Sequence, residues 1–116
     1  MRRSEVWSVS LPATSGREQG GQRPAVVIQD DDYGQGSPLV LVIPITSQMA
    51  ASRFPGSVEI APTPENGLSL RSVAMRFQLR ALDRTRFVRR LGTLSDVEFA
   101  AVFREVKRLI GLDDPE

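Results

Sequence analysis

The chain has 116 residues, of which 41% are hydrophobic and 25% are charged, and its formal net charge is +1. This composition is typical of one globular domain covering residues 1–116 and argues against intrinsic disorder. The absence of cysteine and histidine excludes a thiolate nucleophile, a zinc knuckle and a Ser–His–Asp triad. Any catalysis must therefore use Arg, Lys, Tyr, Ser, Thr, Asp or Glu side chains.

The N-terminus carries no recognisable targeting signal. Residues 1–20 have no apolar signal-peptide core, because Glu5, Ser8 and Ser10 interrupt the apolar positions. No apolar run in the sequence is long enough to span a bilayer. Since the lack of cysteine also suits a reducing compartment, these features predict a cytoplasmic protein.

The first third of the chain predicts three strands. Polar and apolar residues alternate over Glu5–Leu11, which indicates a strand. A long loop at 12–22, rich in Gly, Ser and Gln, leads to a short apolar strand at 24–28. A turn region at 30–38 then precedes an apolar strand at 39–45, which we expect to be buried on both faces.

The clearest helix of the sequence covers Ser95–Ile110, where Ser95 and Glu98 are spaced as a capping box and Gly111 follows as a C-terminal cap. Its apolar stripe comprises Val102, Phe103, Val106, Leu109 and Ile110. Between the third strand and this helix we expect a helical turn at 47–53 capped by Thr46 or Ser47, a strand at 57–60, a loop at 61–70, a strand at 72–77, a turn or short helix at 83–86 and a strand at 87–91. This order predicts a mainly β or α+β fold, a small antiparallel barrel with a C-terminal helix.

Charge is unevenly distributed along the chain. Residues 71–90 contain seven arginines and one aspartate, whereas residues 28–70 contain five acidic residues and one arginine. Arginine is suited to bidentate phosphate contacts and to stacking on bases. The pattern favours a basic surface that meets a polyanion, and a solvated face in an arginine-biased chain is the alternative.

Two places combine polar side chains with the end of a predicted strand. Arg23 precedes Pro24, which biases it toward an extended backbone, so its guanidinium is a candidate phosphate clamp. Thr46 and Ser47 directly follow an apolar strand and are candidates for presenting hydroxyl groups at its rim. The alternatives are a solvated strand end for the arginine and turn capping for the hydroxyls.

A third candidate is the segment Arg-Phe-Gln-Leu-Arg at 76–80. If this segment is a strand, Arg76, Gln78 and Arg80 share one face, suited to phosphate groups and base edges. Phe77 is then expected in the core, on the opposite face. A solvated barrel face is the alternative.

In this order and spacing, the segments resemble the MazF/PemK family of toxin endoribonucleases. The resemblance is carried by EVW at 5–7, GREQ at 16–19, RPAVV at 23–27, DY at 32–33, PITSQ at 44–48, QLRALD at 78–83 and LGTLS at 91–95. It implies a small SH3-like antiparallel barrel of the CcdB/PemK kind, assembled as a homodimer. It also implies a groove that binds single-stranded mRNA beneath the 12–22 loop.

The resemblance implies a toxin that arrests growth by sequence-specific endoribonuclease activity, without a metal or other cofactor. An acidic, MazE-like antitoxin would cover the RNA surface, and operator DNA would be bound only indirectly, through the antitoxin complex. The arginine and threonine that carry cleavage in the family match Arg23 and Thr46. They imply attack of a ribose 2′-OH on the adjacent phosphate, leaving a 2′,3′-cyclic phosphate and a 5′-OH. Four further residues match positions near the RNA path and are expected to bind substrate: Gln19, Ser47, Gln78 and Arg80.

The sequence departs from the family pattern at three positions. Ser4 stands where a glycine usually precedes the acidic residue of the first strand, and Glu5 replaces the more common aspartate. Phe77 stands where an aspartate usually precedes the glutamine, which puts base specificity in question. Two other functions remain compatible with the residues: a CcdB-like toxin that targets a protein such as gyrase, and a non-catalytic barrel that binds nucleic acid through residues 71–90.

Overall fold

The structure is a computed structural model that describes residues 1–12, 21–34 and 36–112. Within these ranges, no helix has the length and apolar content needed to cross a bilayer. The elements follow one another as β1 (Glu5–Leu11), β2 (Gly21–Val27), α1 (Asp31–Gly34), β3 (Leu39–Thr46), η1 (Met49–Arg53), β4 (Ser57–Ile60), β5 (Ser72–Met75), η2 (Arg76–Gln78), β6 (Arg80–Asp83), η3 (Arg84–Arg86), β7 (Phe87–Thr93) and α2 (Asp96–Leu109), where η denotes a 3₁₀ turn.

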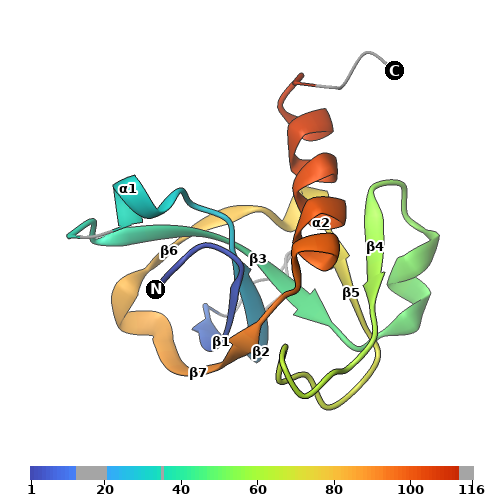
Figure 1. The fold of residues 1–116 in the computed structure, drawn as a ribbon, viewed down its shortest axis with the longest axis horizontal. Helices are drawn as coiled ribbons and strands as arrows, with labels where there is room; N and C mark the ends of the chain where they lie inside the picture. Colours follow the sequence, from blue (N-terminus) through green and yellow to red (C-terminus); the bar gives the residue numbers. More distant parts are fainter. Residues whose placement is uncertain (13–20, 35, 113–116) are drawn as a thin grey trace.

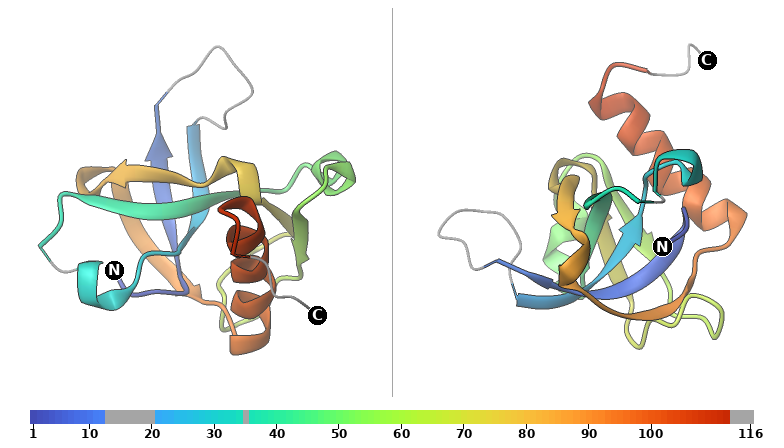
Figure 2. Two further views of the ribbon diagram at one scale, coloured as in Figure 1. Left: turned by 90° about the horizontal axis from the view of Figure 1, so that it is seen from above. Right: turned by 90° about the vertical axis from the view of Figure 1, so that its left-hand side faces the viewer.

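All strand pairs are antiparallel, and the strands follow the order β4-β5-β3-β2-β1-β7, with β6 also paired to β3 (Figures 1 and 2). One edge of β3 pairs with β2, while the other edge pairs first with β6 and then with β5. The described strands form a curved sheet that does not close into a ring of hydrogen bonds. The predicted class, an antiparallel barrel-like β-structure with a C-terminal helix, is confirmed.

The two larger apolar clusters of the described residues hold the sheet together, and β3 contributes to both. Ile43 and Ile45 pack into the first cluster, which includes Val102 and Val106 of α2. The second cluster contains Val40 and Val42 together with residues of β1, β2 and β6. Because successive side chains of a strand point to opposite faces, β3 is buried on both sides, as its apolar sequence predicts.

The C-terminal helix begins as the sequence predicts. Ser95 Oγ accepts a hydrogen bond from Glu98 N, and Glu98 Oε1 accepts one from Ser95 N, which completes the capping box. Gly111 follows the helix with φ +84°, a conformation that favours glycine. The end of the predicted apolar stripe is not covered, since Leu109 is 43% and Ile110 58% exposed.

Several predicted boundaries were wrong. β2 begins at Gly21 rather than at residue 24, so residues 21 and 22 of the predicted loop belong to this strand. Residues 13–20 of that loop lie outside the described residues. The turn region at 30–38 contains the short helix α1, and the strand β6 was not predicted. The helical turn at 47–53 is η1, but its N-cap is Gln48 and no side chain caps it.

The loop at 61–70, predicted correctly, is fastened by one buried amide. Asn66 is 0% exposed, and its Oδ1 accepts hydrogen bonds from the backbone N–H groups of Thr63 and Leu68. Its Nδ2 donates to the Ala61 carbonyl and to Glu98 Oε2. Oδ1 therefore accepts two hydrogen bonds and Nδ2 donates two, and the side chain ties this loop to the first turn of α2.

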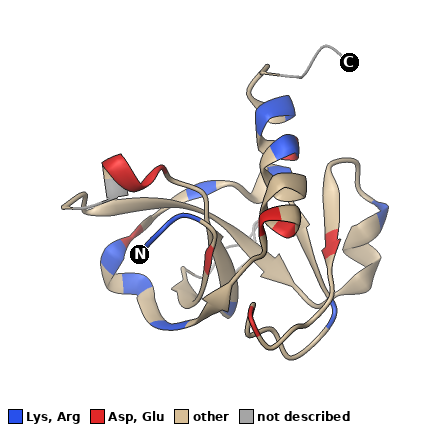
Figure 3. Cartoon of the chain, in the orientation of Figure 1, with Lys and Arg blue, Asp and Glu red and all other residues tan. Residues whose placement is uncertain are grey.

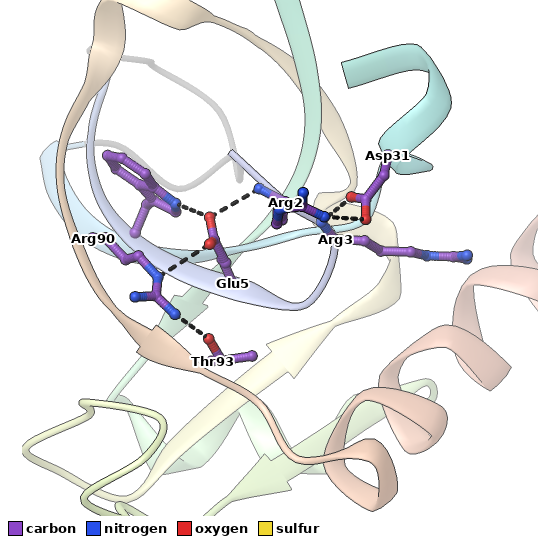
Figure 4. A network of polar contacts seen from close by, with 7 residues as sticks. Arg2, Arg3, Glu5, Asp31, Arg90 and Thr93 are labelled. Carbon is purple, nitrogen blue, oxygen red and sulfur yellow. Dashed lines mark hydrogen bonds and ion pairs between the residues drawn. The ribbon is translucent and has the colours of Figure 1, made fainter. Parts of the chain in front are cut away.

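The start of β1 is anchored by a polar network around Glu5 (Figure 4). Glu5 Oε1 accepts hydrogen bonds from Arg2 N at 2.8 Å and Trp7 Nε1 at 2.9 Å, and Glu5 Oε2 lies 3.1 Å from Arg90 Nε on β7. Burial raises the pKa of the Glu5 carboxyl, but the two hydrogen bonds and the Arg90 charge outweigh burial and hold the pKa below its ordinary value. The tight turn before β1 gives Ser4 a φ of +72°, a conformation that favours glycine.

Replacing Glu5 by glutamine tests this network. A carboxyl with a lowered folded-state pKa contributes stability above its unfolded-state pKa and loses it as pH falls through the folded-state value. Relative to wild type, Glu5→Gln should lower the free energy of unfolding by about 1–2 kcal/mol at neutral pH. Below the ordinary pKa of 4.5 this difference should shrink. Chemical denaturation across this pH range measures it, and a difference that does not change with pH would contradict the assignment.

Candidate active site

Arg23 and Thr46 meet where β2 and β3 lie side by side. Ala25 pairs with Pro44 in the antiparallel register, so continuing that register by two residues sets Arg23 opposite Thr46. Arg23 Nη1 lies 3.4 Å from Thr46 Oγ1, a long hydrogen bond. The two residues, 23 positions apart in the sequence, thus form one polar pair.

The pair is partly enclosed by the sheet. Thr46 is only 5% exposed, and its Oγ1 also accepts a hydrogen bond from Gln48 N at 3.1 Å. Arg23 is half-buried. Pro24, the next residue, pairs with Ser8 of β1, and the proline keeps the backbone of Arg23 extended. The backbone therefore positions both side chains. The predicted strand ended at residue 45, whereas β3 ends at Thr46, so this threonine is the last residue of the strand.

The other predicted substrate-binding residues are placed differently from one another. Ser47 is exposed next to Thr46. Arg80 opens β6, where it pairs with Val42 of β3, and its Nη2 donates to Gln78 Oε1 at 2.9 Å. Gln19 lies outside the described residues.

The predicted faces of residues 76–80 were wrong. Residues 76–78 form the 3₁₀ turn η2, in which side chains do not alternate between two faces. Gln78 is consequently buried at 5% exposure, whereas Phe77, expected in the core, is 47% exposed. Phe54, which sequence analysis did not single out, packs edge-on against Phe77.

The arginines of residues 71–90 are spread over the segment that runs from the residue before β5 to β7. Basic residues gather around the β6–β7 corner (Figure 3). Several of them contact other parts of the protein: Arg71 pairs with Glu59, Arg76 with Glu105 and Arg90 with Glu5, and Arg84 Nε donates to the Ser37 carbonyl. Part of the local positive charge therefore faces carboxylates of the same chain.

Comparison with known proteins identifies the family. A family model described as PemK-like, MazF-like toxin of type II toxin-antitoxin system matches residues 2–110. Endoribonuclease MazF of Staphylococcus saprophyticus is 37% identical over 112 residues, which cover 97% of this chain and 92% of that protein. The chain belongs to the PemK-like, MazF-like toxin family. The predicted membership is confirmed, and the chain is a homologue of endoribonuclease MazF.

Solved structures agree with this membership. MazF of Deinococcus radiodurans superposes with a TM-score of 0.79 at 27% identity, over 96% of both chains. A MazE–MazF structure from the same organism gives a TM-score of 0.74 at 26% identity, over 97% of both chains. A mycobacterial endoribonuclease in complex with its cognate antitoxin has the same fold at 15% identity, with a TM-score of 0.73.

The contacts of Thr46 predict how its variants fold. Thr46→Val keeps the shape but removes the acceptor used by Gln48 N and Arg23, so the free energy of unfolding should fall by about 1 kcal/mol while the toxin remains folded. Thr46→Ser keeps the acceptor and loses only a methyl group. Thermal unfolding of both variants measures this. A collapse of the fold in Thr46→Val would show that the hydroxyl is chiefly structural.

Proposed function

We propose that this toxin cuts single-stranded mRNA without a metal ion, using Arg23 and Thr46 as its catalytic residues. The observation that carries the proposal is the contact between these two side chains, in a chain homologous to endoribonuclease MazF. In the reaction, the ribose 2′-OH gives its proton to water and the 2′-oxygen bonds to the adjacent phosphorus. The bond from phosphorus to the 5′-oxygen then breaks and that oxygen takes a proton from water. The products carry a 2′,3′-cyclic phosphate and a 5′-OH.

Thr46 is suited to hold a phosphoryl oxygen. A hydroxyl group offers two acceptor positions and one hydrogen. Arg23 Nη1 and Gln48 N both donate to Thr46 Oγ1, so its acceptor positions are occupied. The hydroxyl hydrogen is the group left to donate toward the substrate. Because the side chain is buried at the end of a strand, this donor is held in place before the RNA binds.

Arg23 is suited to stabilise the negative charge that builds up on the phosphoryl group. Its guanidinium is planar, permanently charged and matched to phosphate oxygens. A guanidinium does not readily release a proton in proteins, so we assign Arg23 to charge stabilisation and positioning rather than to proton transfer. Neither a guanidinium nor a neutral hydroxyl is a preferred metal ligand, which agrees with metal-independent chemistry. Ser47, Gln78 and Arg80, with Gln19, bind the neighbouring nucleotides.

We also propose that the toxin is a homodimer that pairs with an antitoxin. The uncovered apolar end of α2, at Leu109, Ile110 and Leu112, supports a homodimer, because such side chains are usually buried against a partner. An acidic, MazE-like antitoxin would bind the RNA surface, and the MazE–MazF structure of D. radiodurans supports the pairing of toxin with antitoxin. Residues 1–116 act as one domain in the cytoplasm, and operator DNA is contacted only through the antitoxin complex.

Cleavage of a mixed-sequence RNA in excess EDTA tests the catalytic assignment. Arg23→Ala and Thr46→Ala should each lower kcat/KM by about 100-fold or more, because each removes a donor to the developing charge. Arg23→Lys keeps the charge but not the fork, and should restore only part of the rate. Tyr33→Ala, an exposed residue of α1, is the control and should cut normally. If folded, antitoxin-free wild type leaves the RNA intact, the nuclease assignment falls and a protein-targeting toxin becomes the better explanation.

A further inference from the structure

A cavity of about 300 Å³ opens between η1 and η2. It is lined by Phe54, Met75, Phe77 and Gln78. Phe54 and Phe77 are each 47% exposed, and their rings lie edge to face with centroids 5.8 Å apart. The two rings therefore form a half-exposed apolar pair that borders the cavity.

The cavity lies on the same face of the sheet as the candidate catalytic pair. Thr46 pairs directly with Val73 of β5, and directly opposed residues of an antiparallel pair point to the same face. Met75 follows Val73 by two positions and therefore also points to that face. Met75, which lines the cavity, is thus roughly 7 Å along β5 from Val73, the residue paired with Thr46. A nucleotide next to the cleaved phosphate can bridge this separation.

The turn that displays Phe77 is firmly held. Arg76 N donates to the Gly56 carbonyl, and Arg76 Nη1 lies 3.2 Å from Glu105 Oε1 on α2. Gly56, with φ +80°, leaves the space that the Arg76 side chain occupies, since a Cβ there would overlap it. On the other side of Phe77, the buried Gln78 is bonded to Arg80. Both neighbours are fixed to the body of the protein, and the ring between them is therefore held toward solvent.

We propose that this cavity holds an unpaired base of the RNA substrate, stacked on Phe77 with Phe54 at its edge, and so determines which nucleotide is accepted beside the cleaved phosphate. The inference rests on the proposed nuclease function. The volume is at the lower limit for small-molecule sites, which suits one planar ring system. Aromatic side chains bind single-stranded nucleic acid by stacking, and the Arg80 guanidinium nearby suits the attached phosphate.

A measurement that needs no cleavage tests base binding directly. The wild-type protein is prepared with 4-fluorophenylalanine at its five Phe positions and titrated with single-stranded oligonucleotides whose 2′-OH groups are methylated, so that they bind without being cut. The ¹⁹F resonances of Phe54 and Phe77 should move, whereas those of Phe87, Phe99 and Phe103 should stay. Movement with an acidic apolar peptide but not with RNA would overturn the proposal in favour of a protein partner.

Variants then connect base binding to specificity. Phe77→Ala should lower kcat/KM on the preferred motif by roughly tenfold, mainly through KM, and broaden the range of cleaved motifs. Phe77→Trp, which keeps an aromatic face, should restore most of the loss, and Tyr33→Ala should change nothing. Unchanged cleavage sites and kcat/KM in folded Phe77→Ala would overturn the proposal. If RNA shifts the two ¹⁹F resonances of the wild-type protein but is not cut by it, the nuclease function is contradicted and base binding is not.

Discussion

The pairing of β3 with three other strands is the constraint on which the rest of the structure depends. β2 occupies one edge of β3, and β6 and β5 share the other. Since side chains alternate along a strand, a slip of one residue would exchange the sets buried in the two clusters. The same slip would turn Thr46 away from Arg23. The register that packs the core therefore also assembles the candidate active site, and no separate device is needed to bring the two side chains together.

Elements with a strong local signal could be predicted from the sequence. The alternation over Glu5–Leu11 gave the bounds of β1, and the capping box gave the start of α2. The failures have physical causes. Gly21 has little strand preference and joins β2 only because it pairs with Leu11, a contact that local sequence does not reveal. β6 is four residues long and buries little besides Leu82, so it has no clear period.

The candidate site was predicted in part. The Arg23–Thr46 pair came from the family resemblance, because neither residue alone is specific, and its geometry depends on strands that are distant in sequence. The exposure of Phe77 and burial of Gln78 were predicted in reverse, since a 3₁₀ turn replaced the assumed strand. The contacts of Arg76 with Gly56 and Glu105 hold this turn in place. Contacts between residues distant in the sequence leave no periodic pattern in the local sequence.

In the proposed reaction, RNA is cut by its own 2′-OH, with Arg23 and Thr46 stabilising the charge on the phosphoryl group. The most direct test compares one RNA with a matched oligonucleotide that carries a single 2′-deoxyribose on the 5′ side of the cleaved bond. This substitution should abolish cleavage at that bond, and the intact RNA should yield a 2′,3′-cyclic phosphate. Equal cleavage of both oligonucleotides, or products with a 5′-phosphate, would contradict it.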